Sequence, residues 1–177
     1  MDVASDPSQL EDRLLLPNRN AVRIRPLQRS DEGLIGRFYR RLSPRTRYLR
    51  FWSSMPDPPE SLLRLITSVD GCRRLALIAA SDVDGTDIVA LSEFAALDDR
   101  TAEIGLVVCD EWQRRGLGSA LVMRTLCAAE ARGFDRFVAE VLFYNAGMRR
   151  LLDRVGVVVS RRTTCSASTV TFVRRQS

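Results

Sequence analysis

The sequence predicts an α/β protein of the α+β kind, in which helices cover both faces of a mixed, mostly antiparallel sheet of six to seven strands. Strand-like segments in the middle of the chain follow one another through short turns, which favours antiparallel pairing. Further along, strands alternate with helices, and such crossovers place helices on the faces of a sheet. With 177 residues, 45% of them hydrophobic, the chain is long enough for one domain with a sizeable core.

The N-terminal end of the chain is acidic and polar. Residues 1–18 are therefore expected to form a flexible lead-in, and residues 19–177 a single domain. Apolar and charged residues alternate over 21–25, which predicts a half-buried first strand that ends at Pro26.

Two amphipathic helices are expected next. Ser30 is placed to cap the first, whose apolar stripe runs to Leu42 before the break at Ser43-Pro44. Asp57-Pro58-Pro59 opens the second, which carries apolar residues at helical spacing as far as Val69.

Beyond these helices the apolar period changes to that of strands. Alternation and turn residues predict strands over 75–80, 88–97, 102–109, 136–142, 156–160 and 168–172, and helical spacing predicts helices over 117–132 and 146–155. Gly133 is the expected stop of the longer helix.

The basic residues are all arginine, because the chain contains 27 Lys+Arg residues, none of them lysine, and no histidine. This composition excludes Ser-His-Asp and Cys-His nucleophiles, Schiff-base and P-loop lysines, and zinc sites built on histidine. Acid–base chemistry must come from Asp, Glu, Tyr, Cys, water or the substrate.

The net charge of +5 is concentrated near the N-terminus, where residues 13–50 hold eleven arginines against Asp31 and Glu32. Such a segment is typical of a nucleic-acid patch, of a surface for an acidic or phosphorylated ligand, or of a solvated helix face. Aromatic residues interleave with these arginines only in part, so we expect no nucleic-acid partner.

The cysteines Cys72, Cys109, Cys127 and Cys165 lie far apart, without a C-x-x-C pair, so no metal and no disulfide framework are expected. The longest apolar run near the N-terminus is Leu14-Leu15-Leu16, which is too short for a signal peptide or a membrane anchor. We therefore expect a reduced, cytoplasmic protein without membrane contact.

The most informative segment, residues 103–119, reads as a strand, a polar turn and glycines that open a helix. Gly116 and Gly118 leave room for an anion at the free amides of a helix start, and Arg114 and Arg115 add positive charge. Close packing of the helix start is the alternative explanation for the glycines. A Rossmann fingerprint lacks its first glycine and spacing, and a Walker A motif lacks its lysine.

This segment resembles the acetyl-CoA-binding motif of the GCN5-related N-acetyltransferase (GNAT) superfamily, whose pattern Q/R-x-x-G-x-G/A matches Gln113, Gly116 and Gly118. The similarity covers about residues 21–160, including the helix start at Asn145. Residues 42–51 resemble the subgroup that contains bacterial protein lysine acetyltransferases. The resemblance implies a GNAT fold, acetyl-CoA as cosubstrate and an N-acetyltransferase activity.

The resemblance also implies roles for individual residues. Strand backbone groups would bind the pantetheine arm, the glycine turn would wrap the diphosphate, and the later helix start would lie near the pantetheine. The implied cofactor-binding residues are Leu106, Val107, Val108, Gln113, Arg114, Arg115, Gly116, Leu117, Gly118, Ser119, Asn145 and Met148. A plain helix N-cap is an alternative role for Asn145 that does not exclude this contact.

The implied reaction is direct attack of an amine on the thioester, for which a base must remove a proton from the ammonium. Glu103 stands ten residues before Gln113, where similar protein acetyltransferases carry their glutamate base, and partial burial would raise its pKa. A solvent-facing strand residue is the alternative interpretation, and Glu93 is the second candidate base. Many family members carry a tyrosine acid where this chain has Leu152; Tyr144 is not expected to reach that place, and Cys109 is expected to be buried.

The preferred function is therefore acetyl transfer from acetyl-CoA to a primary amine, a lysine side chain of a protein, with Glu103 as catalytic base. A small-molecule amine as acceptor and a non-catalytic acyl-CoA-binding module remain alternatives. The sequence leaves open whether the protein is a monomer or a homodimer.

Overall fold

The computed structural model describes residues 10–17, 20–81 and 84–176. The strands are β1 (Asp12–Leu15), β2 (Ala21–Pro26), β3 (Arg74–Ala80), β4 (Ile88–Ala96), β5 (Thr101–Val108), β6 (Arg136–Leu142), β7 (Gly156–Thr163) and β8 (Ala167–Arg174). The helices are η3 (Arg29–Asp31), α1 (Glu32–Arg41), α2 (Pro44–Phe51), α3 (Glu60–Thr67), η4 (Asp110–Trp112), α4 (Leu117–Glu130) and α5 (Ala146–Val155). The predicted α/β fold, with a mixed and mostly antiparallel sheet, is confirmed.

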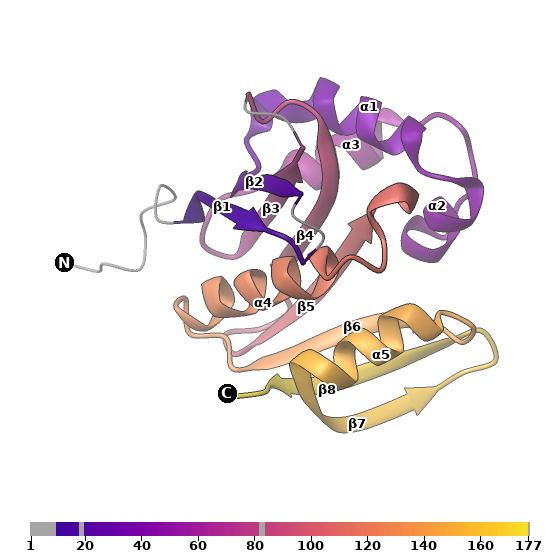
Figure 1. Ribbon diagram of the computed structural model, residues 1–177. Coiled ribbons are helices and arrows are strands. Elements are labelled where there is room, and N and C mark those ends of the chain that lie inside the picture. The colour runs from indigo at the N-terminus through magenta and orange to yellow at the C-terminus, as the bar shows by residue number, and fades with distance from the viewer. Residues whose placement is uncertain (1–9, 18–19, 82–83, 177) are drawn as a thin grey trace.

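The described strands form one sheet of eight in the order β1-β2-β3-β4-β5-β6-β8-β7. Neighbouring strands run antiparallel except β5 and β6, which are parallel. In Figure 1, α1 to α3 lie at the top of the molecule, and α5 with β6 to β8 lies at the bottom.

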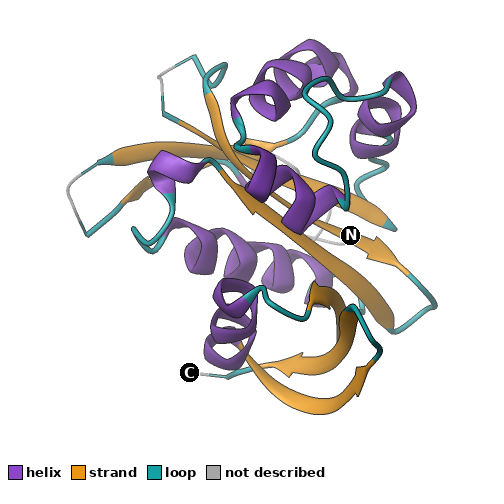
Figure 2. Ribbon diagram, turned by 90° about the vertical axis from the view of Figure 1, so that its right-hand side faces the viewer, coloured by secondary structure: helices purple, strands orange, loops and turns teal. Residues whose placement is uncertain are grey.

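Two apolar cores lie on opposite faces of the sheet. Leu121 and Leu126 of α4, with Leu152 of α5, fill one core, while Ile35 and Phe38 of α1 belong to the other. Helices therefore cover both sides of the sheet, as Figure 2 shows.

The pairing of β5 with β6 is short and positions the functional site. It joins Thr101–Glu103 to Arg136–Val138, and β6 pairs along its full length with β8 instead. The second half of β5 therefore leaves β6, and its backbone on that side is free to bind something other than a strand.

The prediction of a flexible lead-in over residues 1–18 is wrong for Asp12–Leu15, which pair with β2, and for Leu16, which is buried. Residues 1–9 and 18 lie outside the described residues. The strand β1 is short and one-sided, so its alternation was too weak to predict, and it raises the strand number from the expected six or seven to eight.

Two expectations about the helices near the N-terminus also need correction. Ser30 lies within η3, and α1 starts after Asp31, so Ser30 does not cap it. Pro44 ends α1 but also opens α2, in which the hydroxyl of Ser43 accepts a hydrogen bond from the Thr46 amide. A proline at the first position of a helix removes an amide that has no partner there, so Pro44 can open α2, and Leu42 and Ser43 separate the two helices.

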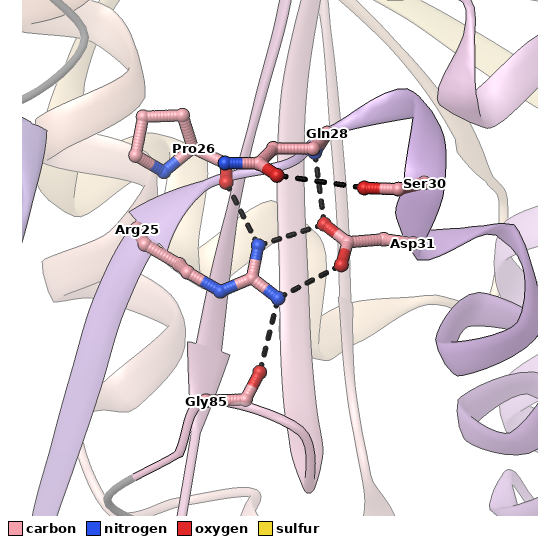
Figure 3. Close-up of polar contacts among 6 residues, drawn as sticks. All are labelled: Arg25, Pro26, Gln28, Ser30, Asp31 and Gly85. Carbon is pink, nitrogen blue, oxygen red and sulfur yellow. Dashed lines mark hydrogen bonds and ion pairs between the residues drawn. The ribbon is translucent and has the colours of Figure 1, made fainter.

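A buried ion pair ties the end of β2 to the start of α1 (Figure 3). The guanidinium of Arg25 donates to both carboxylate oxygens of Asp31 at 2.7 and 2.9 Å, and to the carbonyls of Pro26 and Gly85 at 3.1 and 3.0 Å. The amide of Gln28 also donates to Asp31, at 2.8 Å. One pair thus joins β2, η3 and the turn before β4.

Candidate functional site

A groove of about 440 Å³ runs between β5 and α5, where β5 has left β6. We call it the coenzyme groove; it is lined by Thr46, Leu49, Arg50, Leu106, Val107, Val108, Gln113, Arg114, Gly116, Gly118, Ser119, Asn145, Gly147, Met148, Arg150, Leu151 and Arg154. Ten of the predicted cofactor-binding residues are among these, namely Leu106, Val107, Val108, Gln113, Arg114, Gly116, Gly118, Ser119, Asn145 and Met148. Segments distant in sequence therefore meet in one groove.

The start of α4 lies in this groove without a capping side chain. Its N-cap is Gly116, whose φ of 85° is a left-handed conformation that favours glycine, and no side chain of the described residues accepts from its first amides. By contrast, Ser43 caps α2 and Asn145 caps α5. Uncapped amides at a helix start, together with Arg114, Arg150 and Arg154 in the lining of the groove, suit the diphosphate of coenzyme A. The residues present therefore fit an acyl-CoA.

Gln113 lines the groove and also stabilises the loop before α4 through its side chain. Its Nε2 donates to the Val108 carbonyl at 3.0 Å and to the Thr46 hydroxyl at 3.3 Å, so it fastens the loop to both β5 and α2. The guanidinium of Arg115 lies over the Trp112 ring at 5.6 Å, and Leu117 is fully buried in the core. The side chains of Arg115 and Leu117 do not line the groove.

Asn145 is confirmed as an N-cap, since its side chain accepts from the Met148 amide at 3.0 Å. It lines the coenzyme groove at the same time. Its cofactor contact stays a prediction, as do those of the other groove residues.

Two smaller cavities, of about 250 and 290 Å³, adjoin the coenzyme groove. We call them the Glu103 cavities, because Glu103 lines both; the first shares Leu49, Arg50, Leu106, Asn145 and Met148 with the groove. The second is closed by Leu65 and Ile66 of α3 and also exposes Glu93. The groove and the cavities form a continuous path past the point where β5 and β6 separate.

The strand register brings three glutamates to this path. Glu93 lies opposite Gly105, and Glu103 opposite Val138, two residues before Glu140. Because alternate residues of a strand share a face, all three carboxylates project from the same face of the sheet. Glu93 and Glu140 each line one of the Glu103 cavities.

The electrostatic surroundings raise the pKa of Glu103 above its ordinary value. Glu103 is an exposed strand residue by its surface area, but neighbouring groups partly desolvate its carboxyl, and this desolvation is the main cause. The carboxylates of Glu140 and Glu93 act in the same direction. The guanidinium groups of Arg50 and Arg74 oppose them. The result is a carboxyl group whose affinity for protons is greater than that of a free glutamate.

Glu93, the second candidate base, is already engaged, because its carboxylate forms an ion pair with Arg50. Glu103 has no ion pair of this kind among the described residues, and of the two it has the carboxylate that is free to accept a proton.

Three further positions, 152, 144 and 109, concern the acid that would protonate the departing thiolate. Leu152 is fully buried in the core, and Tyr144 stacks against Tyr48 with ring centroids 6.5 Å apart, outside the cavities. Cys109 is buried as expected, and burial raises the pKa of its thiol to about 12.

In the described part of the chain, no group of three or more His, Cys, Asp or Glu side chains could hold a metal ion, and no helix is long and apolar enough to cross a membrane.

Comparison with known proteins assigns this chain to a family. Residues 38–157 match the model of the acetyltransferase (GNAT) family. The chain belongs to this family, and it is an acetyltransferase that uses acetyl-CoA.

Two curated acetyltransferases are similar in sequence. The chain is 30% identical to acetyltransferase PA5475 of Pseudomonas aeruginosa over 142 residues, which is 79% of this chain and 76% of that protein. It is 32% identical to acetyltransferase Pat of Mycolicibacterium smegmatis over 118 residues, which is 66% of this chain but 35% of Pat.

Solved structures agree with this assignment. The GNAT domain of S. lividans PAT superimposes with a TM-score of 0.85 at 26% identity, covering 95% of this chain and 99% of that one. A cAMP-binding acyltransferase from Mycobacterium smegmatis superimposes with a TM-score of 0.65 at 24% identity, covering 94% of this chain. Of that acyltransferase 48% is covered, so this chain spans about half its length. The predicted relation to bacterial protein lysine acetyltransferases is confirmed.

Sequence reasoning missed several residues that line the path, namely Thr46, Leu49, Arg50, Arg74, Glu140, Arg150 and Arg154. Thr46, Leu49 and Arg50 belong to the unpredicted helix α2. Glu140 lies within the predicted strand 136–142, and the pairing of this strand with β5 is the signal that brings it to the same face as Glu103.

Proposed function

We propose that the chain transfers the acetyl group of acetyl-CoA to a primary amine, a lysine side chain of another protein, with Glu103 as the catalytic base. The observation that carries the proposal is the continuity of the coenzyme groove with the Glu103 cavities through Leu106, Asn145 and Met148. An acyl thioester lying in the groove would meet an amine entering through the cavities.

The proposed chemistry begins with the acceptor, which is an ammonium ion at neutral pH. Removing its proton at pH 7 costs about 4.6 kcal/mol, from a reference lysine pKa of about 10.4. The carboxylate of Glu103 takes this proton, directly or through a water molecule, and the neutral nitrogen attacks the thioester carbonyl carbon. The carbon–sulfur bond breaks, and the departing thiolate takes up the second proton that the nitrogen loses. No tyrosine is required for this last step.

A protein acceptor is supported by exposed aromatic side chains around the cavities. Trp52 is 47% exposed and lines the first cavity, while Tyr48 of α2 and Tyr144 of the turn before α5 stack and are 43% and 52% exposed. Of these three side chains Trp52 alone lines a cavity, and the Tyr48–Tyr144 stack lies outside the cavities. Exposed aromatic groups are typical of surfaces that bind another protein.

The first experiment combines the chain with acetyl-CoA and either a protein mixture or free amines. Mass spectrometry should find new acetyl-lysine on proteins in an acetyl-CoA-dependent manner. Because the chain has no lysine, acetylation of its own side chains cannot contribute. Coenzyme release with free amines alone would favour a small-molecule acceptor, and binding of acetyl-CoA without any transfer would favour a non-catalytic module.

The pH dependence of the reaction follows from Glu103. A base works only when it is unprotonated, and the pKa of Glu103 is raised by burial and by neighbouring carboxylates. We expect kcat, measured by thiol release, to fall as the pH drops through a midpoint above the ordinary glutamate range. A flat profile down to that ordinary range would contradict the role of Glu103.

Binding of the coenzyme depends on the small size of residue 118. A Cβ there would lie 3.2 Å from Leu106 Cδ2, 3.4 Å from Leu151 Cδ1 and 3.6 Å from Val108 Cγ2, at the wall of the groove. We expect Gly118→Val to weaken acetyl-CoA binding by about tenfold or more in calorimetry, because the added atoms would displace Leu106 and Leu151 in the wall of the groove and fill space that the coenzyme would use.

The matched control is Gly33→Val in the first turn of α1, where a Cβ has no atom within 4 Å. It should bind acetyl-CoA like the unchanged protein. Equal affinities for the two variants would place the coenzyme elsewhere.

A further inference from the structure

The side chain of Arg50 lies at the junction of the whole path. It comes from the last turn of α2 and lines the coenzyme groove and both Glu103 cavities. Its guanidinium covers Gly105 of β5 so closely that a Cβ on residue 105 would be 2.8 Å from its Cζ. A glycine at position 105 therefore gives the guanidinium its place on the sheet.

The contacts of Arg50 fix its charge in that place. Its Nη2 forms an ion pair with Glu93, which lies opposite Gly105 on β4, and its Cζ is 5.4 Å from the centre of the Phe51 ring. Its Nε is buried and donates to no group of the described residues. A buried donor without an acceptor costs free energy, so packing alone gives a poor reason for this arrangement.

We propose that Arg50 is a positioning residue for acetyl transfer: clamped on Gly105 by Glu93, it holds a fixed positive charge beside Glu103 at the entry of the acceptor amine. The inference rests on the proposed function, in which Glu103 takes the proton of the amine. Arg50 itself exchanges no proton, since a guanidinium remains charged at all working pH values.

The charges that face Glu103 come from four elements. Arg50 of α2 and Arg74 of β3 favour its carboxylate, whereas Glu93 of β4 and Glu140 of β6 favour its protonated form. The ion pair compensates Glu93, so the clamped Arg50 favours the ionised form of Glu103 against the desolvation of its carboxyl.

The same charge acts on the acceptor. A cation near the entering ammonium disfavours its charged form, as any like charge does. The cation therefore favours release of the proton by the nitrogen and keeps Glu103 in the unprotonated form that a base needs before the reaction, while it lowers the affinity of that carboxylate for the proton.

The experiment measures the ionisation of Glu103 without an acceptor. Protein carrying ¹³C at glutamate Cδ is titrated by NMR, and the Glu103 signal is assigned by its absence in Glu103→Gln. In Arg50→Gln the Glu103 midpoint should rise by about one pH unit, because a cation is lost and Glu93 is left uncompensated. In Glu93→Gln it should fall, and in the double variant it should return close to that of the unchanged protein.

The kinetic midpoint of kcat, with acetyl-CoA and a lysine peptide as probes, should move with the NMR midpoint. At a pH below that midpoint, Arg50→Gln should be about tenfold slower, and on the plateau within about threefold. Arg50→Lys keeps the charge and should restore the midpoint. Merely structural damage would not move the midpoint in opposite directions in Arg50→Gln and Glu93→Gln.

A second variant guards against misfolding. In Gly105→Ala the flexible end of Arg50 must move, and Glu93 Oε1, 3.1 Å from the new Cβ, must adjust slightly, so the chain keeps every charge while the guanidinium leaves its place. Its Glu103 midpoint should also rise. Unchanged NMR midpoints in Arg50→Gln and Gly105→Ala would overturn the inference, whereas shifted NMR midpoints with an unchanged kinetic profile would overturn Glu103 as the base instead.

Discussion

Replacement of Glu103 by glutamine should lower kcat by about 10²- to 10⁴-fold, the usual contribution of a positioned general base. The amide keeps the size of the side chain and removes its ability to accept a proton at working pH. Because Glu103 lines the cavities and not the coenzyme groove, the acetyl-CoA dissociation constant from calorimetry should stay within about threefold of its original value.

The comparison variant is Glu140→Gln, which removes a second carboxylate from the same face and the same cavity. It should cost less than about tenfold in kcat, since Glu140 influences the reaction only through its charge on Glu103. A larger loss in Glu140→Gln than in Glu103→Gln would exchange the two roles. Full activity in both variants would remove carboxylate catalysis from the mechanism.

The parts of the fold that the sequence predicted well are those whose signals are local. Strand 136–142 and helix 146–155 were predicted with the bounds that the structure shows, because apolar period and flanking turn residues agree there. The helix start after Gly116 was predicted for the same reason, and its binding of an anion stays a prediction.

The parts that were missed depend on distant partners. Strand β1 is defined by its pairing with β2. Helix α2 is an exception, because its Ser43 cap and Pro44 are local signals that were interpreted only as the end of the preceding helix. The ion pair of Arg50 with Glu93 over Gly105 requires the β4–β5 register that sets Glu93 opposite Gly105. The apolar periodicity within either strand does not determine that register.

Removal of the Asp31 carboxylate should have the largest effect on stability. Arg25 and Asp31 have side chains only 12% and 8% exposed, and Asp31 accepts both from this guanidinium and from the Gln28 amide. Asp31→Ala leaves a buried guanidinium without its partner, so we expect the free energy of unfolding to fall by about 3–5 kcal/mol in denaturant titrations.

The exposed pair of Glu60 and Arg64, with side chains 80% and 72% exposed, provides the matched control. Glu60→Ala should change the free energy of unfolding by less than about 1 kcal/mol, because solvent screens such a pair. The double variant Arg25→Met with Asp31→Ala should regain part of the loss, since no uncompensated charge then remains buried. Equal losses for Asp31→Ala and Glu60→Ala would contradict the importance of burial.

The same carboxylate should make stability depend on pH in the acid range. Burial raises the pKa of Asp31, but the hydrogen bonds from Arg25 and the Gln28 amide and the charge of Arg25 outweigh it, so the pKa in the folded protein is lowered. A lowered pKa means that the carboxylate stabilises the fold at all pH values above the unfolded pKa of about 3.9. This stabilisation is lost as the pH falls from there through the folded pKa. The difference in unfolding free energy between the unchanged protein and Asp31→Ala should therefore be constant from neutral pH down to about 5 and shrink below about 4. A difference that persists unchanged in acid would show that Asp31 stabilises the fold through its packing and not through its charge.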